Sequence, residues 1–207
     1  MIFDVGGVLA TTGRHTDFAR RFPTEDAEKV TRILLGDYGL DGDHPWHRLE
    51  RGEISLEENR RLNRLALEAA GVQLQLPSPT PGGAPVIEFA ANEPVVQLAR
   101  DVKAAGFRLG VLTNNVKEFR DYWWPMLAFE DMFDDIVDSH EVGLRKPNPA
   151  IYQLALARLG AAAERTAFLD DVPSNVSAAD AVGIRGVLVE PDPTEAVATV
   201  RRWAGLN

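Results

Sequence analysis

The sequence contains no cysteine at any of its 207 positions. Disulfide bonds, zinc sites built from thiolates and a cysteine nucleophile are therefore excluded. Basic residues are also scarce, since 22 Lys and Arg stand against 31 Asp and Glu and give a formal net charge of -9. Because nucleic acids and anionic membranes bind to cationic surfaces, we expect neither kind of partner.

Long apolar runs are missing as well. No stretch approaches the roughly 20 apolar residues that a membrane-spanning helix needs, and the chain starts in an apolar strand pattern without the charged and then apolar leader of a secreted protein. We therefore expect a cytoplasmic location. The 45% hydrophobic and 26% charged residues are typical of a globular protein with one core domain and room for a small insertion.

Short apolar runs alternate with helical patterns at the start of the chain and again after residue 88. Five runs predict buried parallel strands, at residues 1–3, 109–112, 135–137, 167–169 and 187–189. Capping residues and apolar periodicity predict helices at residues 94–105, 149–159 and from 192 to about 203. This alternation predicts a doubly wound α/β fold with a parallel sheet.

Residues 12–88 break the alternation and contain no convincing strand pattern. Thr24 is predicted to cap one helix. Ser55 and Glu58 form a capping box that opens a second helix, which is expected to run to about Ala70. The pattern predicts a helical module between the first strand and the rest of the sheet.

Glycine and proline dominate residues 77–85, which indicates a linker at the end of this module. We therefore predict an α/β core made of residues 1–11 and 89–207. A helical cap of residues 12–88 is expected to interrupt the core after its first strand.

The first candidate site residue is Asp4, which follows the first predicted strand and precedes Gly6 and Gly7. Open α/β sheets bind ligands at the carboxyl ends of their strands, and glycines there let backbone N–H groups approach an anion. Taken alone, an aspartate at a strand end more often caps a turn or helix.

Two later segments offer groups that could bind an anion. Thr113 and Asn114 follow the second predicted strand, where a hydroxyl, an amide and freed backbone N–H groups can all donate, although an ordinary polar turn fits equally well. Lys146 is followed by two prolines within three residues, directly before a helix. Most lysines are solvated surface charges. Because prolines stiffen the chain around Lys146, a fixed cation and a solvated surface charge are equally good interpretations of this lysine.

Asp170 and Asp171 follow the predicted strand at 167–169. Two adjacent carboxylates repel each other unless a cation lies beside them, and hard oxygen ligands suit Mg²⁺. The alternative is a helix cap followed by an acid in the first turn. Because all four segments follow predicted parallel strands or precede their helices, their side chains are expected at one edge of the sheet.

Together these segments resemble the motifs of the haloacid dehalogenase superfamily, in the same order and over nearly the whole chain. Two of them are most similar to the branch that includes the N-terminal phosphatase domain of soluble epoxide hydrolase: Leu-Thr-Asn-Asn at 112–115 and Gly-Leu-Arg-Lys-Pro at 143–147. The resemblance implies a Rossmann-like core with a helical cap inserted after the first strand.

The resemblance also implies a role for each candidate residue. Asp4 would be the nucleophile that forms an aspartyl-phosphate, with Thr113 and Lys146 as further catalytic residues. The phosphate-binding groups would be Gly6, Gly7, Thr113, the Asn114 backbone N–H and Lys146. The Mg²⁺ ligands would be Asp4, the carbonyl of Gly6, Asp170 and Asp171, with Asn175 supporting them.

Gly6 departs from the family pattern, because phosphatases of this kind usually carry a second aspartate there. That aspartate protonates the leaving group and then activates water, and a general acid/base contributes roughly 10²–10⁴-fold to the rate. Reduced activity is therefore one expectation, although some family phosphatases with glycine at this position are active. His15 is the first candidate for a substitute base, against the more common role of a solvated loop histidine.

We therefore predict a Mg²⁺-dependent phosphatase of a small phosphorylated metabolite, and we leave a homodimer open. The main alternative is a catalytically weak domain kept for dimerisation or scaffolding, which Gly6 favours. A 2-haloacid dehalogenase is a minor alternative, because such enzymes need no metal and lack the Asp170–Asp171 pair.

Two aromatic segments allow a functional and a structural interpretation. His44 and His47, beside Trp46, could line the inner face of the cap, although packing or exposure is the more common role. Trp123 and Trp124 are expected to fill the core rather than to form a platform for substrate.

Overall fold

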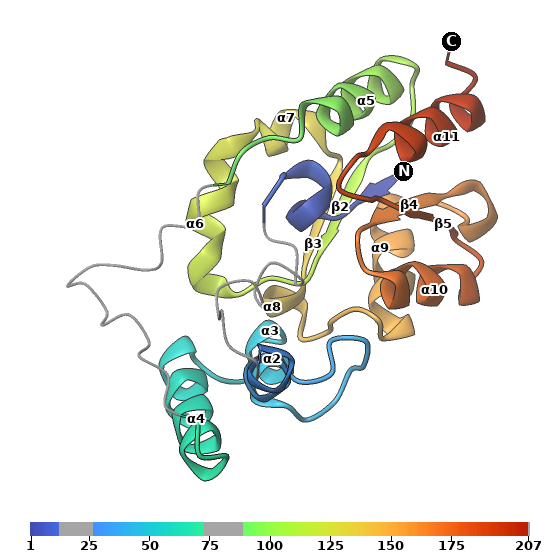
Figure 1. Ribbon diagram of the computed structural model, residues 1–207. Coiled ribbons are helices and arrows are strands. Elements are labelled where there is room, and N and C mark those ends of the chain that lie inside the picture. The colour runs from blue at the N-terminus through green and yellow to red at the C-terminus, as the bar shows by residue number, and fades with distance from the viewer. Residues whose placement is uncertain (13–26, 73–88, 207) are drawn as a thin grey trace.

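The computed structural model describes residues 1–12, 27–72 and 89–206. A parallel sheet of five strands, in the order β3-β2-β1-β4-β5, forms the centre of the α/β core (Figure 1). The strands are β1 (Ile2–Phe3), β2 (Gly110–Thr113), β3 (Asp135–Asp138), β4 (Ala167–Asp170) and β5 (Arg185–Leu188). Each predicted strand is present, and the predicted doubly wound α/β fold is confirmed.

The first strand lies in the middle of the sheet. β1 pairs in parallel with β2 on one side and with β4 on the other, so the direction of winding reverses at β1. In open α/β sheets the crevice at such a switch point, outside the carboxyl ends of the strands, is where ligands bind. Asp4 is the first residue beyond that end of β1.

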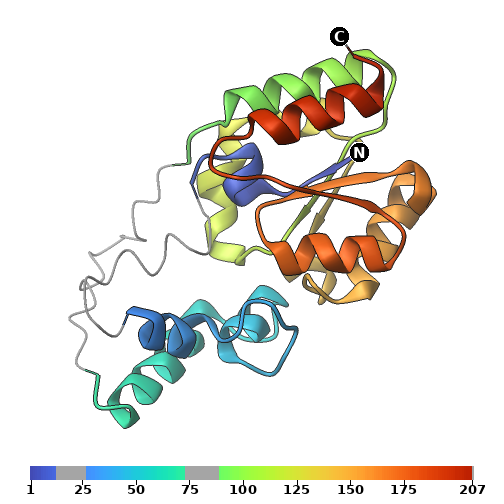
Figure 2. The ribbon, with the colours of Figure 1, turned by 45° about the vertical axis from the view of Figure 1, so that its right-hand side comes forward.

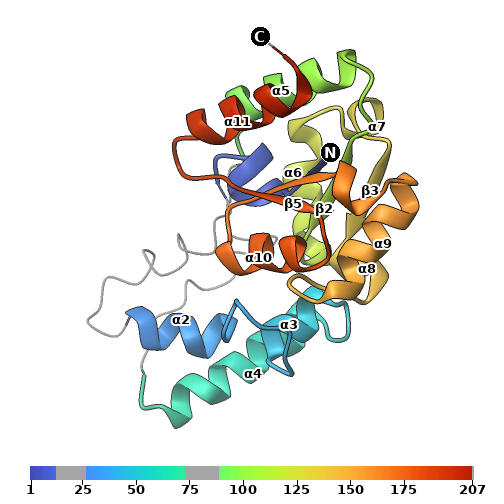
Figure 3. The same cartoon turned by 90° about the vertical axis from the view of Figure 1, so that its right-hand side faces the viewer.

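Two long helices cover each face of the sheet. They are α5 (Glu93–Ala104) and α11 (Thr194–Ala204) on one face, and α9 (Pro149–Leu159) and α10 (Pro173–Ala181) on the other (Figure 3). Successive residues of a strand point to opposite faces. Phe3 therefore joins the core under α5 and α11, whereas its neighbour Ile2 joins the core under α9 and α10.

Helix α9 begins as its sequence predicts. The Asn148 side chain accepts a hydrogen bond from the Ala150 N–H at 3.0 Å, and Pro149 occupies the first helical position. The predicted helices at 94–105 and 192–203 are also present, as α5 and α11.

Helix α10 was not predicted, because its nine residues show no clear apolar face. Three short helices of the core were not predicted either, because a single turn shows no periodicity. They are α6 (Arg120–Trp123), α7 (Phe129–Met132) and α8 (Ser139–Val142). The buried Trp123 ring meets Phe129 edge-on at a centroid distance of 5.0 Å, and Trp124 stacks on the same ring at 5.3 Å. The two tryptophans thus pack against the core, as expected.

Residues 27–72, called the cap below, form three helices and no strand within that range. They are α2 (Ala27–Leu35), α3 (Pro45–Glu50) and α4 (Leu56–Ala69). Buried Val30 and Leu34 of α2 pack against Leu67 of α4. Ser55 caps α4 by accepting the Glu58 N–H at 3.1 Å.

One prediction for the cap is wrong in part, and two others lie outside the described residues. The Glu58 carboxylate bonds Arg61 at 2.7 and 2.8 Å, so only half of the capping box forms. Helix α3 was not predicted. Thr24 and the linker at 77–85 are not among the described residues, and the division into two domains stays a prediction.

The cap lies beside the carboxyl edge of the sheet (Figure 2), where α3 meets α8 just after β3. The backbones approach closely here. Gly52 has a φ of +70°, and a Cβ at this position would lie 2.5 Å from the His140 carbonyl oxygen. Only glycine fits such a left-handed position against another backbone. Within the described ranges, none of the helices combines the length and the apolar composition of a membrane span.

Candidate active site

Lys146 brings two of the predicted carboxylates together. Its Nζ lies 2.6 Å from Asp170 Oδ2 and 2.9 Å from Asp4 Oδ1, and it donates to the Leu112 carbonyl at 3.0 Å. All four residues are buried. Lys146 precedes α9, whereas Asp4 and Asp170 come from the carboxyl ends of β1 and β4, so the sheet edge assembles the predicted cluster.

The same edge offers a set of ligands for a metal ion. Carboxylate oxygens of Asp4, Asp170 and Asp171 all lie within 4.8 Å of one another. Asp170 is oriented by the Val172 N–H at 2.8 Å and by Asn175 Nδ2 at 3.1 and 3.2 Å. Three converging hard oxygen donors fit Mg²⁺, and Asn175 contacts the ligand that it was expected to support.

The electrostatics of the cluster follow from burial and close pairing. Burial, with a smaller contribution from the Asp170 charge, raises the pKa of Asp4 to about 6 against the opposing effect of Lys146. Burial disfavours the charged form of Lys146, but the charges of Asp170 and Asp4 and their hydrogen bonds raise its pKa. The lysine is therefore a permanent cation between two carboxylates.

The π-helical turn Val5–Leu9, which follows Asp4, contains two glycines with different backbone conformations. Gly7 has a φ of 71°, which favours glycine, and its N–H donates to the Thr12 carbonyl at 3.0 Å. Gly6, at φ -67° and ψ 126°, has a backbone conformation that any residue can adopt. The missing aspartate is therefore not explained by the backbone at position 6.

Asn114 has a role that the sequence did not reveal. Its side-chain Oδ1 accepts the Lys146 N–H at 2.8 Å, and its Nδ2 donates to the Lys146 carbonyl at 3.0 Å. The amide thus holds the backbone of Lys146 on both sides. Thr113, predicted to follow the second strand, is the last residue of β2 and is buried.

A buried ion pair joins the cap to the residue next to Lys146. Arg145 Nε donates to Glu50 Oε2 at 2.8 Å, and both side chains are at most 2% exposed. Glu50 Oε1 also accepts from Tyr38 Oη at 3.1 Å and from Trp46 Nε1 at 2.9 Å. Sequence reasoning missed this cluster, because Glu50 and Arg145 are 95 residues apart and neither has a pattern that identifies its partner.

Two histidines of the cap have structural roles. His44 Nδ1 accepts the Trp46 N–H at 3.1 Å and so caps α3, and His47 Nδ1 accepts the Gly42 N–H at 3.1 Å. Burial and the nearby Arg145 charge lower the pKa of the buried His47 to about 4, so its ring is neutral near pH 7. Both histidines thus take part in the packing and hydrogen bonding of the cap, as the structural interpretation predicted. His15 lies outside the described residues.

A second polar cluster follows β3 and was not predicted. Asp138, fully buried, lies 2.6 Å from His140 Nδ1 and accepts from Asn115 Nδ2 at 2.9 Å. Burial raises its pKa despite these partners. This cluster ties the end of β3 to the loop after β2.

Comparisons with known proteins identify one family of hydrolases. The model of the haloacid dehalogenase-like hydrolases matches residues 1–183. Bifunctional epoxide hydrolase 2 of Rattus norvegicus is 28% identical over 98% of this chain and 38% of its own length, so the chain spans well under half of that relative. The sesquiterpene phosphatase astK of Aspergillus oryzae is 29% identical over 90% of this chain and 87% of its own.

A solved structure shows the same fold at low sequence identity. An enzyme of this family from Bacteroides thetaiotaomicron, in complex with magnesium and inorganic phosphate, superposes with a TM-score of 0.61 at 18% identity. The alignment covers 92% of this chain and 93% of that one.

Proposed function

This chain belongs to the haloacid dehalogenase-like hydrolases, and from that premise we propose that it is a Mg²⁺-dependent phosphatase of a small phosphorylated metabolite. The observation that carries the proposal is the buried lysine that bridges Asp4 and Asp170 beside Asp171. One site thus holds a nucleophile, a fixed cation and oxygen donors for a metal. The phosphatases among the relatives support the same chemistry.

The reaction needs two displacements at phosphorus. A carboxylate oxygen of Asp4 attacks the phosphorus, an aspartyl-phosphate forms, and the bond to the alcohol oxygen breaks. Water then attacks the same phosphorus, the bond from phosphorus to the Asp4 oxygen breaks, and phosphate leaves. The proton that this water gives up to solvent balances the proton that the departing alcohol oxygen took from solvent. Lys146 stabilises the charge on the phosphoryl oxygens in both steps, and Thr113 and the Asn114 N–H donate to them.

The metal would be held by Asp4, Asp170, Asp171 and the Gly6 carbonyl, with Asn175 supporting Asp170. When bound, Mg²⁺ supplies positive charge that lets two anions, the carboxylate and the phosphate ester, approach each other. We also propose that residues 12–88 are a cap domain that restricts access to this edge.

Metal removal tests the proposal. With p-nitrophenyl phosphate as substrate, EDTA is expected to lower phosphate release by about 100-fold or more, because two like-charged reactants then lack their screening ion. Mg²⁺ in excess should restore the rate.

Two other outcomes would favour the alternatives. Mg²⁺ binding without turnover of any sugar, nucleotide or lipid phosphate would favour a catalytically weak domain, for which Gly6 is the support. Halide release from 2-haloacids in EDTA would favour a dehalogenase, although the Asp170–Asp171 pair argues against it. Phosphate release that is unchanged in EDTA would contradict the metal dependence.

Gly6→Asp is expected to accelerate hydrolysis of alkyl phosphates by about 10²-fold, because it supplies the missing general acid/base. The φ and ψ of position 6 are values that any residue can adopt. Aryl phosphates should change much less, since their leaving groups depart without a proton.

The matched control is Gly6→Asn, which has nearly the same volume but cannot protonate a leaving group. The measurement is the ratio of kcat for an alkyl and an aryl phosphate in the three proteins. Equal ratios in all three would show that position 6 does not limit the rate.

A further inference from the structure

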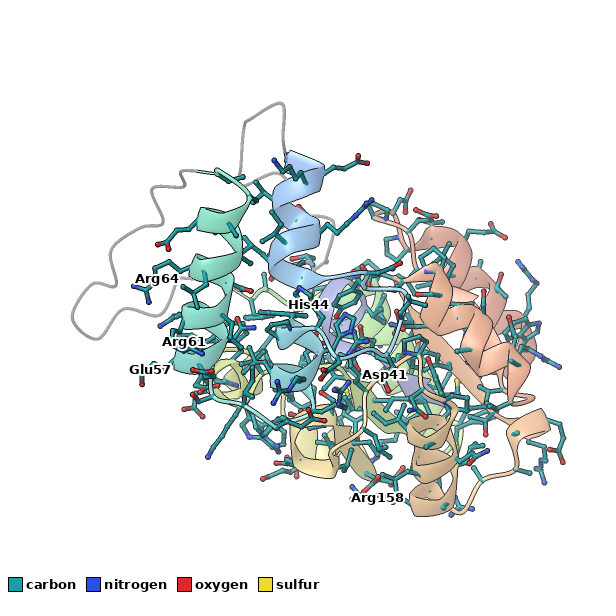
Figure 4. The ribbon with its side chains drawn as sticks, turned by 90° about the horizontal axis from the view of Figure 1, so that it is seen from below. Asp41, His44, Glu57, Arg61, Arg64 and Arg158 are labelled. Carbon is teal, nitrogen blue, oxygen red and sulfur yellow. The ribbon has the colours of Figure 1, made fainter. Side chains whose placement is uncertain are left out.

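The segment that carries Lys146 is held from two sides. On the core side, the Asn114 side chain bonds the Lys146 backbone at 2.8 and 3.0 Å. On the cap side, Arg145 bonds Glu50, and Asn148 Nδ2 donates to Asp41 Oδ2 at 2.9 Å. Figure 4 shows Asp41 on the cap segment that faces the core.

Arg145 depends on the cap for its charge partner. The side chain is fully buried, and its Nη1 donates to the Leu40 carbonyl, again in the cap. The Tyr38 ring lies 5.3 Å from the guanidinium carbon, and Nη2 has no hydrogen-bond partner among the described residues. Within the described chain, Glu50 alone forms a salt bridge with this cation.

Two other residues of the cap orient the Glu50 carboxylate toward Arg145. Tyr38 Oη and Trp46 Nε1 both donate to its Oε1, which leaves Oε2 for Arg145 Nε. Burial and the Glu50 charge raise the pKa of Tyr38, so the phenol keeps its proton and can donate. The cap therefore presents an oriented carboxylate to the core.

We propose that Arg145, held by Glu50 of the cap, is a positioning residue that fixes Lys146 between Asp4 and Asp170. The two side chains belong to adjacent residues, so a displacement of Arg145 moves the Lys146 backbone directly. The Lys146 side chain is long and flexible, and its contacts at 2.6 and 2.9 Å require a fixed backbone. The contacts of the cap with Arg145 thereby hold the Lys146 backbone in place.

The consequence for rate rests on the proposed phosphatase function, but the positioning does not. Glu50→Gln is expected to raise the exchange rate of the Lys146 amide hydrogen about 10-fold, because the hydrogen bond from that amide to Asn114 Oδ1 opens more often. On the phosphatase proposal, kcat for an aryl phosphate should fall about 10- to 100-fold while KM changes little, since a small misplacement of a catalytic group has that effect.

A double variant separates positioning from stability. Glu50→Gln with Arg145→Met removes both buried charges and keeps an acceptor for Tyr38 and Trp46, so the protein should fold even where the single variant does not. It is nevertheless expected to show the faster Lys146 amide exchange and the reduced kcat. The matched control is Glu58→Gln, which removes the exposed Glu58–Arg61 pair of α4; Arg61 lies on the outer side of that helix (Figure 4).

Two results would overturn the proposal. One is a folded double variant with the Lys146 amide exchange rate of the unmodified protein. The other is an equal change in the Glu58→Gln control. If the unmodified protein releases no phosphate, the proposed function fails while amide exchange still decides whether Arg145 positions Lys146.

Discussion

Asp4→Asn is expected to lower phosphate release by about 10⁵-fold, because the loss of a nucleophile removes the covalent route altogether. A carboxamide has nearly the same shape as a carboxylate but cannot attack phosphorus. The variant should fold normally, since Lys146 keeps its 2.6 Å contact with Asp170. The measurement is kcat for p-nitrophenyl phosphate in Mg²⁺, with the thermal unfolding midpoint as the check on folding.

Trapping the intermediate makes this test specific. Radiolabelled phosphate from the substrate should remain on the unmodified protein after an acid quench and be released by hydroxylamine, as an acyl phosphate is. Asp4→Asn should retain none. Turnover in Asp4→Asn close to that of the unmodified protein would exclude Asp4 as the nucleophile.

Lys146→Met should have the second largest effect, a loss of about 10³-fold in kcat, because preorganised charge at the phosphoryl oxygens is lost. Removing the cation also leaves Asp4 and Asp170 as two buried carboxylates without their partner. Breaking a buried pair in this way destabilises a protein by about 3–5 kcal/mol. The control is Lys103→Met, which removes a half-exposed lysine on α5.

The stability deficit of Lys146→Met should depend on pH in a defined direction. Burial already raises the pKa of Asp4 to about 6, and without Lys146 the folded-state value rises further. A carboxyl group whose pKa is higher in the folded than in the unfolded state binds its proton preferentially when folded. The deficit in free energy of unfolding, measured by urea titration in EDTA, should therefore be small near pH 4 and grow toward pH 7.

The core of this protein could be predicted because its signals are local. Apolar runs of three or four residues defined every strand, and the polar residues after them had to meet at one edge once the sheet was parallel. Asp4 and Asp170 were found in this way, and Lys146 was found by the prolines that follow it directly before a helix. The side-chain role of Asn114 was missed, because its partner is the backbone of Lys146, and a backbone group leaves no trace in a sequence.

The cap was harder to predict for the opposite reason. Helix α3 is only six residues long, and two of its three buried residues, His47 and Glu50, are polar, so no apolar periodicity marks it in the sequence. Their partners lie elsewhere in the fold, and the Glu50–Arg145 pair spans 95 residues.

The three contacts of Lys146 have a consequence for how product leaves. An ammonium group has three N–H bonds, and Asp4, Asp170 and the Leu112 carbonyl accept from Nζ. A phosphate oxygen can bind Nζ only by displacing one of these acceptors, so binding is an exchange of one partner for another rather than a net gain. Inorganic phosphate should for this reason be a weak competitive inhibitor. Its departure is favoured because the Lys146 ammonium group then regains its contacts with Asp4, Asp170 and the Leu112 carbonyl.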